Sequence, residues 1–268
     1  MQPDFGEIEP LPAPLPTPLP PEDTPHQIQS APIPDERQPF WGYSDLALVI
    51  GLLFASIVLL LLLIGGLNAV YPKIQTNPTA LVLPMQLALY GLIYLDFRLI
   101  FGARYGRPVF ASLGWRRTGF NVFLTVIGGI ALAFALSAIA SLIHTPKVDS
   151  PIEQLAKDPV NFVAFAIIAV SIAPLFEELF FRGFLQPLFS RSVGMVAGIV
   201  LTAALFGALH APEYSWAWQY GVAVGLAGAI FGWIRAKTNS IIPSTIMHGS
   251  YNAVFVVALA FSKHSLNR

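Results

Sequence analysis

The stretch Pro174-Leu-Phe-Glu-Glu-Leu-Phe-Phe-Arg182 decides how the rest of the chain is interpreted. Its two acidic residues, Glu177 and Glu178, follow a run over 160–176 that contains no charged residue. A carboxylate at the centre of a membrane helix costs about 2.5–3.5 kcal/mol on insertion scales, so two adjacent carboxylates are rarely retained without a function. The stretch therefore predicts a functional site inside a hydrophobic span.

The composition of the whole chain is that of a membrane protein. Of its 268 residues, 55% are hydrophobic and only 11% are charged, whereas soluble domains carry about 25% charged residues. The formal net charge is zero, which argues against a nucleic-acid partner because the chain has no overall basic field. The sequence contains no cysteine, so disulfides, thiolate nucleophiles and cysteine-ligated metals are excluded.

Residues 1–39 have the composition of a proline-rich, acidic tail. They contain 12 of the 23 prolines, and seven acidic residues against one arginine. Proline at this density favours neither a helix nor a strand, so we expect an extended or disordered cytoplasmic tail. A solvated tether is the main interpretation, and a docking motif for an unknown partner is the alternative. Phe40, Trp41 and Tyr43 then predict an aromatic belt at the membrane surface.

Seven hydrophobic segments follow the tail, each close to the roughly 20 residues that a helix needs to cross a bilayer. They cover residues 46–70, 81–101, 120–143, 160–180, 193–210, 216–234 and 241–261. The sequence therefore predicts an all-α, polytopic membrane domain over 40–268 with about seven transmembrane helices. An eighth span or a re-entrant segment is the alternative.

Basic residues indicate how these spans are oriented. The loop between the second and third spans is rich in arginine, whereas the loop before it holds only Lys73. The arginines are Arg98, Arg104, Arg107, Arg116 and Arg117. By the positive-inside rule this loop is cytoplasmic. Counting along the chain then places the N-terminus, and the arginines that follow the fourth span, on the cytoplasmic side.

The two glutamates are expected to have different partners, because adjacent residues on a helix point about 100° apart. Glu178 and Arg182 are four residues apart and can form an ion pair on one face. Glu177 has no cation at this spacing, so it is left to face a cavity. Pro174 cannot donate to the helix ladder and is expected to kink or loosen the helix. Two purely structural carboxylates at the end of the span are the alternative.

Further polar residues interrupt the last spans. The fifth span ends in Phe206 to His210, and the seventh contains His248 and Asn252 on one helix face. An imidazole and a carboxamide on one face offer two hydrogen-bond donors to a single oxyanion. With Glu177 as the general base and His210 sharing its proton, this set suits hydrolysis of an amide bond by water.

Other functions are compatible with the same residues. Glu177, His210 and His248 are acceptable zinc ligands, and three ligands with one open position define a catalytic zinc site. The sequence lacks a His-Glu-x-x-His motif and the candidates are dispersed, so we expect no cofactor and keep zinc as the alternative. The three residues could also relay protons in a proton-coupled transporter. A non-catalytic immunity or scaffold protein is the third hypothesis.

Three motifs in succession resemble those of the CAAX protease and bacteriocin-processing family of intramembrane proteases, also called the CPBP or Abi family. The motifs are Glu-Glu-x-x-x-Arg, Phe-x-x-x-His and His-x-x-x-Asn, formed by Glu177, Glu178, Arg182, Phe206, His210, His248 and Asn252. The resemblance covers about residues 155–260, and the first three spans fit only loosely.

The resemblance implies a membrane enzyme with a four-helix catalytic core and a conical cavity at its C-terminal end. Glu177 and His210 would activate water and His248 and Asn252 would form the oxyanion hole, with the other motif residues in supporting roles. The implied activity is that of a glutamate-type endopeptidase, historically called a metalloendopeptidase. The implied substrate is a membrane-associated or prenylated protein or peptide. We therefore expect an integral multi-pass protein of a prokaryotic plasma membrane.

Overall fold

The computed structural model describes residues 1, 39–70, 78–148 and 158–266. The chain divides into two units, Met1–Asp35 and Glu36–Arg268. Apart from Met1, all of the described residues belong to the second unit. Residues 2–38 of the predicted proline-rich tail, and Lys73, lie outside the described residues.

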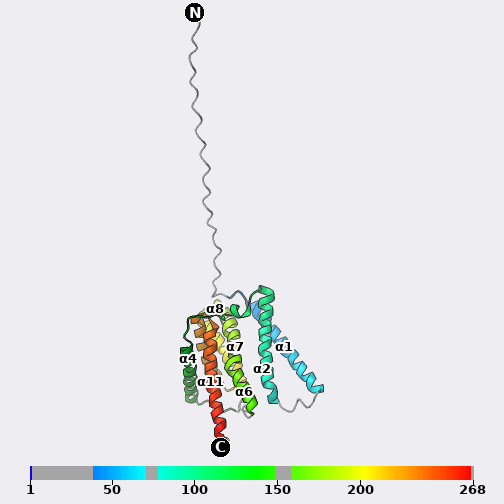
Figure 1. Ribbon diagram of the computed structural model, residues 1–268, viewed down its shortest axis with the longest axis vertical. Helices are drawn as coiled ribbons and strands as arrows, with labels where there is room; N and C mark the ends of the chain where they lie inside the picture. The colour runs from blue at the N-terminus through cyan, green and yellow to red at the C-terminus, as the bar shows by residue number, and fades with distance from the viewer. Residues whose placement is uncertain (2–38, 71–77, 149–157, 267–268) are drawn as a thin grey trace. The chain divides into compact units, whose positions relative to one another are not determined.

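The described residues contain helices and no β-strand. The α-helices are α1 (Tyr43–Val70), α2 (Pro78–Leu99), α3 (Val109–Ser112), α4 (Val122–Leu142), α6 (Pro159–Ile167), α7 (Ala173–Glu177), α8 (Gln186–Val193), α9 (Met195–His210), α10 (Trp218–Thr238) and α11 (Ile241–Leu266). Three π-helical segments, η2 (Ile100–Arg104), η3 (Ile168–Ile172) and η4 (Glu178–Leu185), and one 3₁₀ turn, η5 (Ala211–Tyr214), connect some of them. Figure 1 shows the bundle that they form.

Six helical stretches are long and apolar enough to cross a membrane: Tyr43–Leu67, Leu81–Arg104, Val122–Leu142, Pro159–Val193, Met195–Tyr214 and Ile241–Ser262. They match six of the seven predicted spans, and the chain is an all-α, multi-pass membrane protein. The remaining predicted span, 216–234, forms helix α10 but is not among the six. Its four glycines and polar first turn reduce its hydropathy. No eighth span occurs within the described ranges.

The fourth span is longer than the sequence predicts. Helical structure continues from Pro159 to Val193 through α6, η3, α7, η4 and α8. The π-helical segments flank α7, which contains Pro174. Because proline offers no N–H to the preceding turn, the regular helix ladder is interrupted there. The predicted loosening at Pro174 is confirmed, but the predicted boundary at residue 180 is wrong, since Arg182 lies inside the helix and is fully buried.

Side-chain caps set the starts of two helices near this region. The Asp158 carboxylate accepts a hydrogen bond from the Asn161 backbone N–H at 2.8 Å, and Pro159 occupies the first turn of α6. Asn121 accepts from the Leu124 N–H at 3.0 Å at the start of α4. Such caps satisfy backbone donors that have no partner within the helix, and proline is well tolerated in the first turn.

Arginine-bearing segments meet at one end of the bundle. Arg104 pairs with Asp45 at the start of α1 at 3.0 Å, and Arg191 at the end of α8 donates to the Pro39 carbonyl at 3.0 Å. The Ser240 hydroxyl, just before α11, donates to the Arg116 carbonyl at 2.6 Å. Helix α11 then runs towards the opposite end of the bundle (Figure 1). This agrees with the prediction that the arginine-rich loops share one side of the membrane.

Trp41 belongs to the core of the bundle and not to a surface belt. Its side chain is 3% exposed, and its indole N–H donates to the Phe184 carbonyl at 3.2 Å. The two aromatic rings stack with centroids 5.7 Å apart. A buried indole needs an acceptor for its N–H, and the Phe184 carbonyl supplies one. The prediction of a surface belt is therefore wrong for Trp41.

Glycines bring α10 close to its neighbours. A Cβ atom on Gly207 of α9 would collide with the Gly221 carbonyl of α10. Further along α10, a Cβ atom on Gly228 would lie 2.9 Å from the Arg182 guanidinium. Gly221, Gly225, Gly228 and Gly232 recur every three or four residues along α10 and form a stripe of small residues that allows this close approach. The same stripe also makes room for a charged side chain of η4.

Candidate active site

Glu178 and Arg182 form the predicted ion pair in the interior of the bundle. Glu178 Oε1 lies 2.9 Å from Arg182 Nη1, and both side chains are completely buried. Arg182 Nη2 also donates to the Gly228 carbonyl at 2.9 Å. The guanidinium carbon lies 4.4 Å from the centre of the Phe206 ring. The carboxylate, the carbonyl and the aromatic face compensate part of the cost of removing this cation from water.

Glu177 faces a different set of side chains. Its Oε1 accepts a hydrogen bond from the Tyr90 hydroxyl at 3.2 Å. Its Oε2 lies 3.6 Å from Nε2 of His248 and 4.0 Å from Nε2 of His210. The Glu177 side chain is 18% exposed, whereas the Glu178 side chain is fully buried. Glu177 is therefore the carboxylate that water or a substrate can reach.

His248 lies between the two carboxylates. Its Nδ1 is 3.2 Å from Glu178 Oε1, while its Nε2 faces Glu177. The Glu178 carboxylate, which is paired with Arg182, can only accept hydrogen bonds. Nδ1 of His248 therefore carries the hydrogen of this contact. The ring stacks on Phe231 with centroids 4.6 Å apart. The predicted difference between the two glutamates is present, because Arg182 pairs with Glu178 alone and Tyr90 bonds to Glu177 alone. His248 is a neighbour that the two glutamates share.

His210 presents one ring nitrogen to the site. Its Nδ1 lies 2.7 Å from the Phe206 carbonyl, and a carbonyl can only accept, so Nδ1 donates. In the neutral ring, Nε2 then directs its lone pair towards Glu177. Helix α9 ends here, and Pro212 follows within the next turn, where proline is common. Glu213 in that turn interacts electrostatically with both His210 and Glu177.

Asn252 is held by the backbone of the π-helical segment. Its Nδ2 donates to the Ala169 carbonyl at 2.8 Å. Pro174 has no N–H with which to reach a carbonyl five residues earlier, so the carboxamide can take that place. A Cβ atom on Gly249 would lie 2.5 Å from the Val170 carbonyl, so glycine is needed for this approach of α11. The amide keeps a second N–H, and its role at an oxyanion stays a prediction.

Tyr90 is a site residue that sequence reasoning missed. It lies on α2, outside the expected core of about residues 155–260, and is 4% exposed. Its ring stacks on Phe176 with centroids 5.2 Å apart and an interplanar angle of 10°. Gln86 Nε2 donates to the Tyr90 hydroxyl at 2.6 Å. The signal was present in the sequence, because these two polar residues are four apart in the stretch 81–93, which is otherwise apolar.

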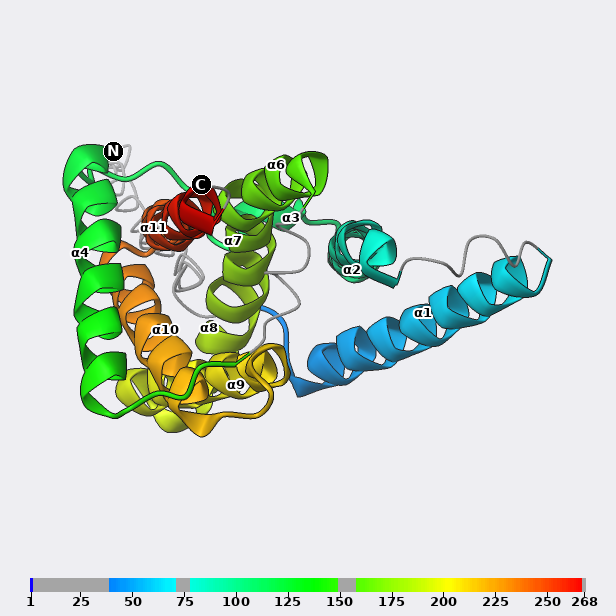
Figure 2. The same cartoon turned by 90° about the horizontal axis from the view of Figure 1, so that it is seen from below.

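The site residues come from four helices that meet in the bundle. Figure 2 shows α7 lying between α2, α9 and α11. These helices carry Glu177, Tyr90, His210 and His248, respectively. In the described part of the chain, no three His, Cys, Asp or Glu residues are grouped so as to hold a metal ion. The zinc alternative, with Glu177, His210 and His248 as ligands, stays a prediction.

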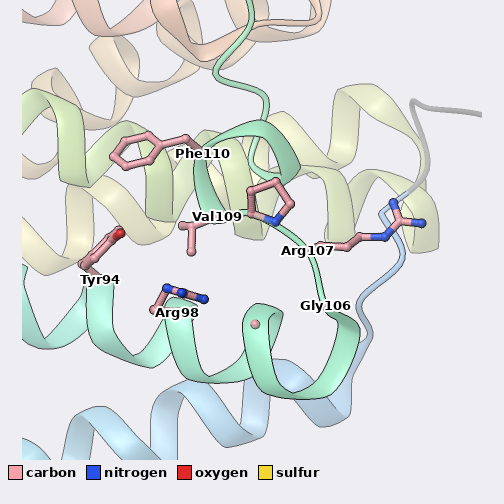
Figure 3. Close-up of a pocket in the computed structure, with 8 residues that line it drawn as sticks. Tyr94, Arg98, Gly106, Arg107, Val109 and Phe110 are labelled. Carbon is pink, nitrogen blue, oxygen red and sulfur yellow. The ribbon is translucent and has the colours of Figure 1, made fainter.

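Two clefts open at other places on the described residues. One has a volume of about 550 Å³ and lies at the end of α2, where Figure 3 shows the Arg107 side chain extending away from Arg98. The other, of about 860 Å³, is an apolar groove between α4, the η3–α7 segment and α11. Glu177, His210 and His248 line neither cleft. The conical cavity implied by the resemblance stays a prediction.

The fold and the site define a multi-pass helical membrane protein with a buried Glu–Arg pair and a reachable glutamate beside two histidines. Residues 159–254 match the family model described as type II CAAX prenyl endopeptidase Rce1-like. The resemblance predicted from the motifs is thus confirmed over this segment. The segment includes every motif residue from Glu177 to Asn252 and excludes Tyr90.

The chain is also similar to a curated bacterial protein. The uncharacterized protein YyaK of Bacillus subtilis (strain 168) is 32% identical over 163 residues, which cover 58% of this chain and 52% of the relative. The chain thus spans about half the length of this relative. No solved structure matches the chain.

Proposed function

We propose that this protein is an intramembrane endopeptidase that cleaves a membrane-associated or prenylated (CAAX-type) protein or peptide. The observation that carries the proposal is the reachable Glu177 carboxylate, which lies near Nε2 of both His210 and His248 inside a membrane span. The match to a family described as CAAX prenyl endopeptidases supports the same activity. Glu177 and the two histidines can activate water directly, so we assign water as the attacking group.

The separation between Glu177 and His210 suits a shared water molecule. Two hydrogen bonds of about 2.8 Å that meet at roughly a right angle join atoms about 4 Å apart. This is the distance of 4.0 Å between Glu177 Oε2 and His210 Nε2. Because Nδ1 of His210 donates to the Phe206 carbonyl, Nε2 can accept the second hydrogen of that water. Glu177 then removes the first hydrogen as the water attacks.

The site residues can account for each bond that forms and breaks during hydrolysis. The water oxygen bonds to the carbonyl carbon of the substrate, its proton passes to Glu177, and the carbonyl oxygen becomes an oxyanion. The second N–H of Asn252 and the Nε2–H of His248 in its protonated form are the donors that we assign to this oxyanion. The C–N bond then breaks, and the leaving amine takes the proton from Glu177.

We further propose that hydrolysis needs no bound cofactor, because Glu177 and His210 supply the base and the water contact themselves. Cleavage is expected to persist after dialysis against EDTA and 1,10-phenanthroline, and the rate of product formation is the measurement. Loss of activity on chelation, followed by recovery on adding Zn²⁺ alone, would show that the zinc alternative is correct.

The activity can be tested with the protein reconstituted in liposomes that contain a lipid-anchored peptide. The expected result is cleavage at one peptide bond, with both products identified by mass spectrometry. Solute flux that depends on a pH gradient, without any cleavage, would instead support a proton-coupled transporter. A reconstituted protein with neither activity would support the immunity or scaffold hypothesis.

We also propose that the protein lies in a prokaryotic plasma membrane with its arginine-rich end and N-terminus in the cytoplasm. Because the chain has no cysteine, single cysteines can report each side of the membrane. Gly119→Cys, at the arginine-rich end, is expected to react with an impermeant maleimide only after the cells are opened. Lys147→Cys, after α4, is expected to react in intact cells. The reverse pattern would overturn this orientation.

A further inference from the structure

The two oxygens of the Glu177 carboxylate have separate surroundings. Oε2 faces the two histidine Nε2 atoms, where the proposed water is bound. Oε1 faces α2 and accepts the hydrogen bond from the Tyr90 hydroxyl. The terminal torsion of a glutamate is broad and has no strong preference of its own. An external contact is therefore needed to keep Oε2 directed at the histidines.

Tyr90 is itself held on two sides. Its ring stacks on Phe176, the residue before Glu177, and its hydroxyl accepts from Gln86 Nε2 at 2.6 Å. An amide N–H can only donate, so the hydroxyl oxygen is used as the acceptor towards Gln86. The single hydroxyl hydrogen of Tyr90 is then free to be donated to Glu177. The two hydrogen bonds, from Gln86 to Tyr90 and from Tyr90 to Glu177, thus run in the same direction.

We propose that Tyr90 is a positioning residue that orients the Glu177 carboxylate, so that α2 completes the active site from outside the segment matched by the family model. This inference rests on the proposed peptidase function. A carboxylate held by a second contact takes the proton from water in one geometry instead of many, and loss of such supporting contacts typically costs about 10- to 100-fold in activity. Tyr90 would not touch the substrate, so its effect should appear in kcat and not in KM.

Tyr90→Phe is the variant that tests this role, because it keeps the ring that stacks on Phe176 and removes only the hydroxyl. With the reconstituted protein and the lipid-anchored peptide, kcat is expected to fall by about 10- to 100-fold while KM changes by less than about twofold. Tyr94→Phe is the matched control. Its ring lies one turn further along α2 and lines the cleft with Arg98, so kcat is expected to stay within about twofold of the wild-type value.

Infrared difference spectra provide a readout that does not depend on turnover. The carboxylate bands of Glu177, assigned by their loss in Glu177→Gln, are expected to shift in Tyr90→Phe and to stay in place in Tyr94→Phe. Unshifted bands together with an unchanged kcat would overturn the positioning role while leaving the peptidase function intact. Absence of cleavage by the wild-type protein would instead overturn the peptidase function, and with it the inference about Tyr90.

Discussion

Replacing Glu177 with glutamine is expected to lower kcat/KM for the lipid-anchored peptide by about 10²- to 10⁴-fold, the usual contribution of a general base. The amide has nearly the same shape and can still accept the hydrogen bond from Tyr90, but it cannot take a proton from water. Glu178 cannot replace it, because this neighbour is completely buried and paired with Arg182. The rate of peptide cleavage in liposomes is the measurement.

Asp158→Asn is a matched control for this substitution. It makes the same change from carboxylate to amide on the same long helix, at the exposed start of α6. Asn is as good an N-terminal cap as Asp, so the hydrogen bond from the Asn161 N–H can be kept. Activity and thermal unfolding are both expected to match the wild type. If Glu177→Gln cleaved the peptide as fast as this control, Glu177 would not be the base.

Breaking the buried ion pair is expected to have the largest effect on stability. Arg182→Met removes the cation and leaves Glu178 buried without its ion-pair partner, which typically costs about 3–5 kcal/mol. The loss would be measured as a lower midpoint of thermal or denaturant unfolding in detergent. Wild-type stability in this variant would contradict the view that the pair supports the fold.

A second variant separates the charge effect from the packing effect. Replacing both partners, as in Glu178→Gln with Arg182→Met, leaves no unpaired charge and is expected to recover most of the lost stability. The native pair is itself incompletely satisfied, since Arg182 Nε has no hydrogen-bond partner among the described residues. A double variant as unstable as Arg182→Met would instead assign the loss to the contacts of the guanidinium with the Gly228 carbonyl and the Phe206 ring.

Several features could be predicted from the sequence because they depend on local geometry or on composition alone. The helical class and most spans follow from long apolar runs, since a bilayer requires about 20 such residues for each crossing. The Glu178–Arg182 pair follows from a spacing of four on one helix. The loosening of the helix at Pro174 follows from the missing N–H of proline. None of these inferences needs the position of another helix.

The arrangement of the site was decided only by the tertiary structure. His248 lies between both glutamates, Tyr90 reaches Glu177 from α2, and Trp41 is buried against Phe184. Each contact depends on how far a helix is rotated and tilted against its neighbours. A helix that is apolar on every side carries little pattern to indicate that rotation. In a membrane the rotation is set by close packing, as at Gly207 and Gly249, and by polar contacts between helices, which exist only once the bundle has assembled.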